Sequence, residues 1–292
     1  LHDVVQVLAD LDEPRVLVPL DVGAVNACAA AFVVVAFAVP ARKGEADLLA
    51  GLGEMLLKIL AGDRGVVFAQ GEFVPQLVGV LHGEEGVAKT FLQELTANRS
   101  KFLSKQGLRG KTNISEAISD LLRSNGEVST PDRKGFKSGL YGEEKSAYQH
   151  YMRTGVDALI PNSHSFAKHT AEKQALFDRL IKEYPEKGKR IDGKAREPWG
   201  IKQRGLFILD GESVAPTITN MPDDYLHYQE PRILTVRECA RIQSFPDWYE
   251  FKSKYTTGGD MRKKEVPRYS QVGNAIPPLF AEQAGLVLKK ML

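Results

Sequence analysis

The chain has 292 residues with 39 Lys and Arg, 37 Asp and Glu and a net charge of +2, so bulk charge alone does not indicate a nucleic-acid partner. Its length suffices for one large domain or two smaller ones with a buried core. Cys28 and Cys239 are too few for a disulfide framework or a cysteine zinc site, so we expect a reducing cytoplasm and no metal. His164 and His169 have no third ligand nearby in sequence, and we expect surface or DNA-backbone roles for them.

Residues 1–87 differ in composition from the rest of the chain. They contain no Ser, Thr, Tyr or Trp, although Ser is among the commonest residues of ordinary proteins. The apolar run 29–40 is shorter than the roughly 20 residues of a membrane-spanning helix and indicates a buried strand. The leucine spacing over 46–60 is typical of a helix. The segment is either an unusual domain or the product of out-of-frame or antisense translation, and we expect no membrane span.

Conventional helix signals begin after residue 88. Apolar spacing predicts a helix over 90–103, and Asn113 with Glu116 predicts the capping box of a second helix. Residues 124–145 are rich in Gly, Ser, Asp and Lys and are predicted to form a loop. The Lys and Arg residues within 101–111 are candidates for phosphate contacts, although charge runs of this kind are usually only solvated.

Shorter elements are predicted further along the chain. A helix is expected over 170–184, and a basic stretch over 187–196 is a second candidate for phosphate contacts. Residues 205–210 are predicted to form a strand and turn. Residues 213–220 are predicted to form a second strand, which Pro216 would confine to the edge of a sheet.

The segment 231–249, PRILTVRECARIQSFPDWY, predicts a capped helix. Thr235 and Glu238 have the spacing of a capping box, and the pair Phe245-Pro246 is expected to end the helix. A generic helix does not explain the complete set of residues at these spacings. That set is Arg232, Thr235, Arg237, Glu238, Arg241, Gln243, Phe245 and Pro246.

The last segment, 268–292, reads RYSQVGNAIPPLFAEQAGLVLKKML and predicts a terminal helix. We expect Asn274 to cap this helix and Pro277 and Pro278 to lie in its first turn, where proline sacrifices little hydrogen bonding. Gln271 and Gly273 complete a second distinctive set with these residues.

Together, the two segments resemble the ninth and tenth conserved motifs of DNA (cytosine-5)-methyltransferases. The resemblance implies an α/β fold of the S-adenosylmethionine-dependent methyltransferase type, present here mainly as the smaller target-recognition domain with the C-terminal helix. It implies a target-recognition region over 88–230 and motifs over 231–292 that return to the catalytic domain. The whole protein would be a bacterial restriction-modification enzyme that methylates cytosine in double-stranded DNA.

The resemblance also assigns roles to particular residues. Gly273 and Asn274 fall beside the S-adenosylmethionine pocket. Thr217 and Thr219 fall on the DNA-facing loop, where small hydroxyls can bond phosphate oxygens, and ordinary strand threonines are an equal alternative. Cys239 is expected to be a small buried hydrophobe. Structural roles are expected for Arg232, Thr235, Arg237, Glu238 and Gln243.

The residues that perform the methyl transfer are missing from the sequence. The reaction needs a thiolate that adds to the cytosine ring, which the family supplies from a Pro-Cys pair. Ala27 precedes Cys28, and Glu238 precedes Cys239. No Phe-x-Gly-x-Gly cofactor loop is present, and the VPQ at 74–76 is interpreted as a chance match to the eighth motif. We therefore expect no turnover from this chain. Three identities are compatible with that expectation: a C-terminal part of the enzyme, a recognition subunit that serves a separate catalytic half, or a pseudogene product.

Overall fold

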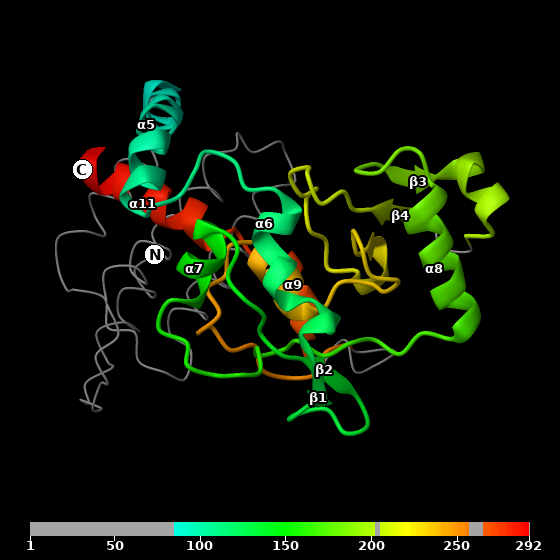
Figure 1. Cartoon of the computed structure of the whole chain (residues 1–292). Helices are drawn as coiled ribbons and strands as arrows, with labels where there is room; N and C mark the ends of the chain where they lie inside the picture. Colours follow the sequence, from blue (N-terminus) through cyan, green and yellow to red (C-terminus); the bar gives the residue numbers. More distant parts are fainter. Residues whose placement is uncertain (1–84, 202–204, 257–264, 292) are drawn as a thin grey trace. The chain divides into compact units, whose positions relative to one another are not determined.

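The computed structural model describes residues 85–201, 205–256 and 265–291. The chain divides into two compact units, one of Leu1–Thr96 with Ala281–Leu292 and one of Ala97–Phe280. Figure 1 shows helices and short strands, which is the mixed α/β composition expected from the sequence. The α-helices of the described residues are α5 (Glu85–Lys105), α6 (Ile114–Ile118), α7 (Ala147–Arg153), α8 (Ala171–Glu183), α9 (Val236–Ile242), α10 (Arg268–Gly273) and α11 (Pro278–Met291). The short 3-10 helices are η1 (Ser119–Leu121), η2 (Arg123–Asn125), η3 (Gly193–Trp199) and η4 (Pro222–Asp224). The strands are β1 (Glu127–Ser129), β2 (Lys137–Gly139), β3 (Arg190–Asp192), β4 (Gly205–Ile208) and β5 (Tyr225–Leu226).

In the unit that contains Ala281–Leu292, parts of α5 and α11 contact each other. Gln283 Nε2 donates to the carbonyl oxygen of Leu95 at 2.7 Å, and Lys290 Nζ lies 2.7 Å from a carboxylate oxygen of Glu94. The predicted terminal helix is confirmed and begins at Pro278. Buried apolar residues of this unit are Phe91, Ala281, Ala284, Val287 and Leu288.

The larger hydrophobic core of the second unit forms around α9, which contacts α6 and α10. The predicted capping box of α6 is confirmed, because Asn113 Oδ1 accepts from the Glu116 N–H at 2.7 Å and Glu116 Oε2 accepts from the Asn113 N–H at 3.0 Å. The box fixes the start of a helix of only five residues, whose apolar face then enters the core. That face consists of Ile114, Ala117 and Ile118.

A second core forms between α8 and a three-stranded sheet. β3 pairs with β4 in antiparallel orientation, and β4 pairs with β5 in parallel orientation. The predicted helix over 170–184 is confirmed as α8, with Thr170 as its N-cap, and the strand predicted over 205–210 is confirmed as β4. The core residues contributed by α8 and the three strands are Phe177, Leu180, Ile191, Leu206, Ile208 and Leu226.

The loop prediction for 124–145 is wrong over part of its length, because β1 and β2 form an antiparallel hairpin there. Its buried contacts are polar. Ser138 Oγ donates to Thr130 Oγ1 at 3.1 Å, and Thr130 Oγ1 donates to Ser165 Oγ at 3.2 Å. A hairpin held by hydroxyl groups lacks the apolar alternation that marks a strand in a sequence.

The strand prediction for 213–220 is also wrong, because this segment is the connection between β4 and β5 and has no strand partner. Its backbone bonds to a side chain instead. The Tyr225 hydroxyl donates to the Thr217 carbonyl oxygen at 2.6 Å and accepts from the Thr219 N–H at 2.9 Å. The Tyr225 hydroxyl thus takes the place of two backbone hydrogen bonds that a neighbouring strand would have supplied.

The strand predicted for 29–40, the helix predicted for 46–60 and the chance match at 74–76 lie outside the described residues. Within the part of the chain that the structure describes, no helix is long and apolar enough to cross a membrane.

Candidate functional site

The site is built on α9, whose first turn carries the predicted capping box. Thr235 Oγ1 accepts from the Glu238 N–H at 3.2 Å, and Glu238 Oε2 accepts from the Thr235 N–H at 2.7 Å. Glu238 also binds Arg232 in a bidentate pair with distances of 2.8 and 2.6 Å. Burial opposes ionisation of Glu238, but the Arg232 guanidinium holds the pKa of this carboxyl well below its usual range. The helix start and the preceding chain are therefore one charged, hydrogen-bonded unit.

Arg237 fastens the middle of α9 to two neighbouring loops. Its Nε donates to the Asn162 carbonyl oxygen at 2.8 Å, and one terminal nitrogen donates to the Tyr249 carbonyl oxygen at 2.6 Å. Another terminal nitrogen donates to the Pro246 carbonyl oxygen at 3.3 Å. The side chain is fully buried and contacts mostly backbone, so it positions loops and is not accessible to a substrate.

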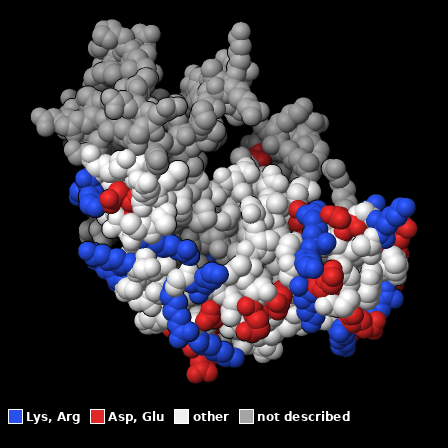
Figure 2. Space-filling model, turned by 90° about the horizontal axis from the view of Figure 1, so that it is seen from above, with Lys and Arg blue, Asp and Glu red and all other residues white. Residues whose placement is uncertain are grey.

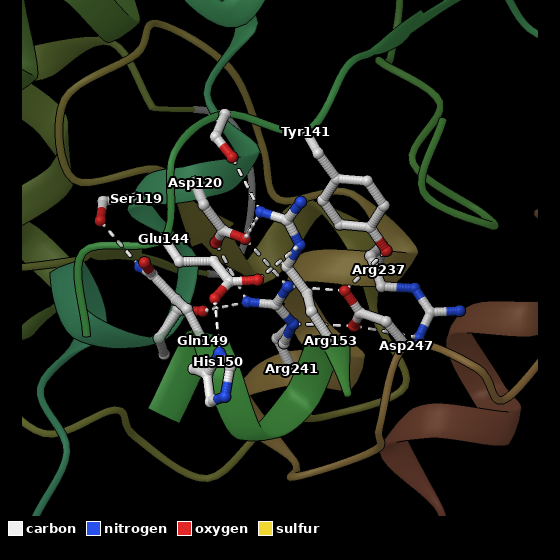
Figure 3. Close-up of polar contacts among 12 residues, drawn as sticks. Ser119, Asp120, Tyr141, Glu144, Gln149, His150, Arg153, Arg237, Arg241 and Asp247 are labelled. Carbon is white, nitrogen blue, oxygen red and sulfur yellow. Dashed lines mark hydrogen bonds and ion pairs between the residues drawn. The ribbon is translucent and has the colours of Figure 1, made fainter. Parts of the chain in front are cut away.

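Arg241 holds the end of α9 through two carboxylates, as Figure 3 shows. Its guanidinium lies 3.0 Å from both oxygens of Asp120 and 2.7 and 2.6 Å from those of Asp247. Tyr141 adds a hydroxyl that donates to Asp247 Oδ2 at 2.7 Å. Burial opposes ionisation of Asp247 as well, but Arg241 keeps the pKa of this carboxyl below its usual value. This network connects η1, α9 and the loop after α9.

Sequence reasoning missed Asp120 and Asp247 as partners of Arg241. A signal was available, because an arginine on the apolar side of a buried helix requires an acidic partner. Both aspartates stand next to apolar residues, in the stretches AISDLL and FPDWY. The pair of Arg241 with Asp120 joins positions 121 residues apart, which no local pattern indicates.

Gln243 and Ser244 connect the end of α9 to the two helices that follow it in the chain. Gln243 is the C-cap of α9, and its Nε2 lies 3.5 Å from the Val272 carbonyl oxygen in α10. Ser244 has a φ of 61°, a left-handed conformation that is unusual for a residue other than glycine. Its Oγ accepts from the Leu279 N–H in the first turn of α11 at 3.1 Å, which satisfies one donor at the start of that helix.

The structure brings Gly273 and Thr219 together. A Cβ atom at Gly273 would lie 2.4 Å from the Thr219 carbonyl carbon and 2.4 Å from the Asn220 nitrogen. Any residue larger than glycine at position 273 therefore collides with the loop between β4 and β5. Thr217 is exposed, and the half-buried Thr219 donates its hydroxyl to Asp224 Oδ2 at 3.0 Å.

The prediction that Asn274 caps the terminal helix is wrong. Asn274 is the C-cap of α10, and its N–H bonds to the Ser270 carbonyl oxygen at 3.0 Å. Three residues separate Asn274 from Pro278, the first residue of α11. The cap at this place comes from Ser244, which is distant in sequence and carries no capping signal of its own. The Asn274 side chain is exposed.

The expected surface role of His164 is wrong, because this residue is fully buried. Its Nδ1 lies 2.9 Å from Thr235 Oγ1, and burial lowers its pKa to about 4. His169 is half-buried, and its Nε2 accepts from the Ile233 N–H at 3.4 Å. No group of three His, Cys, Asp or Glu side chains among the residues with assigned structure is placed to hold a metal.

Cys239 is buried within α9 with an exposed fraction of 3%, as predicted for a small hydrophobic side chain. Burial raises the pKa of its thiol far above the ordinary value. The thiol is neutral at physiological pH and is inaccessible to a ligand in solution. Cys28 lies outside the described residues.

The chain belongs to the C-5 cytosine-specific DNA methylase family, whose model matches residues 81–290. This match confirms the family that the two C-terminal motifs indicated, a family whose members use S-adenosylmethionine.

Several characterised relatives share parts of the sequence. The chain is 30% identical over 182 residues to the type II methyltransferase M.DdeI of Desulfomicrobium norvegicum, which covers 59% of this chain and 41% of the relative. It is 38% identical over 86 residues to the type II methyltransferase M.AquIB of Picosynechococcus, and this alignment covers 29% of this chain and 62% of the relative. It is 42% identical over 67 residues to mouse DNA (cytosine-5)-methyltransferase 1, which covers 23% of this chain and 4% of the relative. The chain thus spans less than half the length of M.DdeI.

Proposed function

We propose that this chain is the C-terminal, target-recognition part of a DNA cytosine-C5 methyltransferase and transfers no methyl group on its own. The observation that carries the proposal is the burial of Cys239 inside α9. A cytosine C5 methyltransferase needs a thiolate that reaches C6 of a flipped base. A neutral thiol with an exposed fraction of 3% in the middle of a helix cannot do this without unfolding the helix.

DNA recognition is assigned to the loop between β4 and β5. Thr217 is exposed there, and small hydroxyls of this kind bond phosphate oxygens in protein–DNA complexes. The Tyr225 hydroxyl fixes the backbone on both sides of position 218, so the loop is preorganised for a ligand. The target sequence is set by residues that the loop presents and by no general code.

We assign Asn274 to the cofactor side because its segment resembles the tenth motif and its side chain is exposed, while its neighbour Gly273 contacts this loop. S-adenosylmethionine, when bound, supplies the methyl group. The Thr219 carbonyl occupies the space where a Cβ atom of Gly273 would lie, so the cofactor cannot contact Gly273 from that side. Gly273 instead allows the loop between β4 and β5 to approach the backbone next to Asn274.

The test uses the purified chain, radiolabelled S-adenosylmethionine and cytosine-containing duplex DNA. We expect no label in the DNA from the chain alone, and label when the chain is mixed with the part of M.DdeI that lies outside the shared region. Cys239→Ser and Cys28→Ser variants serve as controls and should behave like the wild type in the mixture. Incorporation by the chain alone that either serine variant abolishes would overturn the proposal.

A second candidate is a recognition subunit that serves a separate catalytic polypeptide. It is favoured by the similarity to M.AquIB, a methyltransferase polypeptide so short that 86 aligned residues make up 62% of it. A subunit would bind one duplex sequence by itself and would co-purify with a second chain. Binding of all duplexes with equal affinity would exclude this candidate.

A further inference from the structure

A run of five cations lies on the second half of α5 and the loop that follows it. No Asp or Glu occurs between positions 97 and 112. All five side chains belong to exposed residues, and none forms an ion pair with an acidic residue that the structure describes. We call this set the α5 basic patch, and it consists of Arg99, Lys101, Lys105, Arg109 and Lys111.

The loop after α5 folds back against the helix, so the segment of Arg109 and Lys111 lies beside Arg99. The chain reverses after α5 at Gly107, which has a φ of 71°, and the Leu108 N–H returns to the Leu103 carbonyl oxygen at 2.8 Å. Arg99 then donates to the Gly110 carbonyl oxygen at 2.5 Å and holds the returning loop against the helix. Leu108 and Phe102 are buried beneath, so the polar side chains are directed outward. Figure 2 shows Lys and Arg side chains gathered on the left of the face drawn, where α5 and this loop lie.

The other basic stretch, 187–196, differs in its surroundings. Lys189 lies 3.5 Å from Glu186, and Arg190 lies 3.8 Å from Asp224. Asp192 adds a further negative charge within the stretch. The positive charge there is locally compensated, whereas the α5 basic patch has no acidic partner among the residues that the structure describes. The structure therefore distinguishes two stretches that looked equivalent in the sequence.

Two cations of the α5 basic patch also lower the stability of the helix. Lys101 and Lys105 are four residues apart on one helical face, and like charges at this spacing destabilise a helix. Lys105 in the last turn interacts favourably with the helix dipole, but Lys101 has no such compensation. Uncompensated cations on a rigid surface are typical of sites that bind a polyanion.

We propose that the α5 basic patch binds the phosphate backbone of duplex DNA without reading its sequence, and so adds to the contact made by the loop of Thr217 and Thr219. The proposal rests on the proposed function only in naming DNA as the polyanion. Neutralised phosphates release counterions, and each contact therefore contributes to the salt dependence of binding. The patch supplies affinity, while the loop supplies the choice of sequence.

The test measures binding of the full chain to a fluorescein-labelled duplex by anisotropy over a series of salt concentrations. The variant combines Lys101→Gln, Lys105→Gln and Arg109→Gln. The control combines Lys182→Gln, Lys189→Gln and Lys252→Gln, which remove three exposed lysines that already pair with Asp178, Glu186 and Glu250. For the patch variant we expect the slope of log K against log salt to decrease by about 2 to 3, since each phosphate contact contributes about 0.9. The control should keep the wild-type slope.

A wild-type slope in the patch variant overturns the proposal and leaves the proposed function intact. Absence of DNA binding by the wild-type chain at every salt concentration overturns both. If the triple variant does not fold, Lys105→Gln alone decides, with an expected decrease of about 0.9. Loss of binding to phosphatidylserine vesicles with unchanged binding to DNA would assign the patch to a membrane surface and overturn the proposal.

Discussion

Arg241 is a charged residue that serves as a structural element of the core. Its guanidinium donates to Asp120, to Asp247 and to the Ala117 carbonyl oxygen at 2.9 Å, so nearly all its hydrogen-bonding capacity is used. Desolvation of a buried ion is compensated only when geometry and hydrogen bonding are this complete. The main effect of Arg241 is therefore to specify that α6, η1 and the loop after α9 meet at this point. Its net contribution to stability is smaller.

Substitution of Arg241 tests this interpretation. Arg241→Met removes the cation that is hydrogen-bonded to both buried carboxylates and leaves only the longer ion pairs with Arg153 and Arg237, so we expect the free energy of unfolding to fall by about 3–5 kcal/mol. Urea denaturation followed by circular dichroism measures the change. Lys182→Met is the matched control, since Lys182 pairs with Asp178 on the surface and should cost less than about 1 kcal/mol. Equal effects of the two substitutions would contradict the assigned role.

At the scale of elements, the contact between α10 and the loop after β4 connects the segment 268–292 to the loop that we propose binds DNA. Gly273 allows the approach because the space of a side chain is taken by backbone atoms of Thr219 and Asn220. Backbone cannot move aside as the end of a flexible side chain can. The contact therefore depends on the absence of a single methyl group.

Gly273→Ala should displace the loop between β4 and β5. Overpacking of this kind costs about 1–3 kcal/mol, and we expect a lower melting temperature together with weaker DNA binding. Thermal unfolding and anisotropy measure the two effects. Gly110→Ala is the matched control, because a Cβ atom there meets nothing within 4 Å, and it should change neither quantity measurably. Unchanged DNA binding by Gly273→Ala would exclude coupling between α10 and the loop.

The elements themselves were largely predictable, whereas their mutual contacts were not. Caps at Asn113, Thr170 and Thr235 are local signals, and each marks the start of a helix in the structure. The hairpin of β1 and β2 was not predicted because its sequence lacks apolar alternation. The segment 213–220 has the composition of a strand, but its backbone bonds to the Tyr225 hydroxyl and not to another strand. The Ser244 cap and the pair of Arg241 with Asp120 join distant positions, so only the folded chain reveals them.

At the scale of the whole molecule, Glu238 is the centre of a buried cluster drawn from separate parts of the larger unit. His164 precedes α8, His227 follows β5, and Arg232 lies just before α9. His227 Nδ1 accepts from the Gln229 and Glu230 N–H groups, and its Nε2 lies 3.6 Å from Glu238 Oε1. Burial and the nearby Arg232 keep both histidines neutral in the folded state.

This cluster predicts acid sensitivity of the fold. The pKa of His164 is lowered to about 4 and that of His227 to about 3, whereas an unfolded histidine has a pKa of 6.5. The unfolded chain therefore binds more protons below pH 6.5, and stability falls as pH decreases from there, by up to about 1.4 kcal/mol per pH unit for each histidine. Glu238 adds a further loss below pH 4.5, because its folded pKa is also lowered.

Urea unfolding at a series of pH values measures this loss. His164→Gln should flatten the dependence between pH 6.5 and 4 by removing the contribution of one histidine, even if it lowers stability at neutral pH. His150→Gln, which alters an exposed histidine of α7, is the comparison variant. A slope unchanged by His164→Gln would place the acid-sensitive group elsewhere.

The connection between β4 and β5 has a consequence for how the protein can diversify. Its two ends are held side by side by parallel strand pairing, and the hydroxyl of Tyr225 clamps the stretch around Thr217 and Thr219. Lengthening a connection whose ends are fixed costs little, since the entropy of closure grows only with the logarithm of length. Insertions beside the exposed Val214 should therefore cost little for folding, whereas Gly211 and Ser213 accept hydrogen bonds from the first N–H groups of α6 and have to keep their places. New binding preferences can arise there by small mutational steps while the scaffold around α9 stays the same.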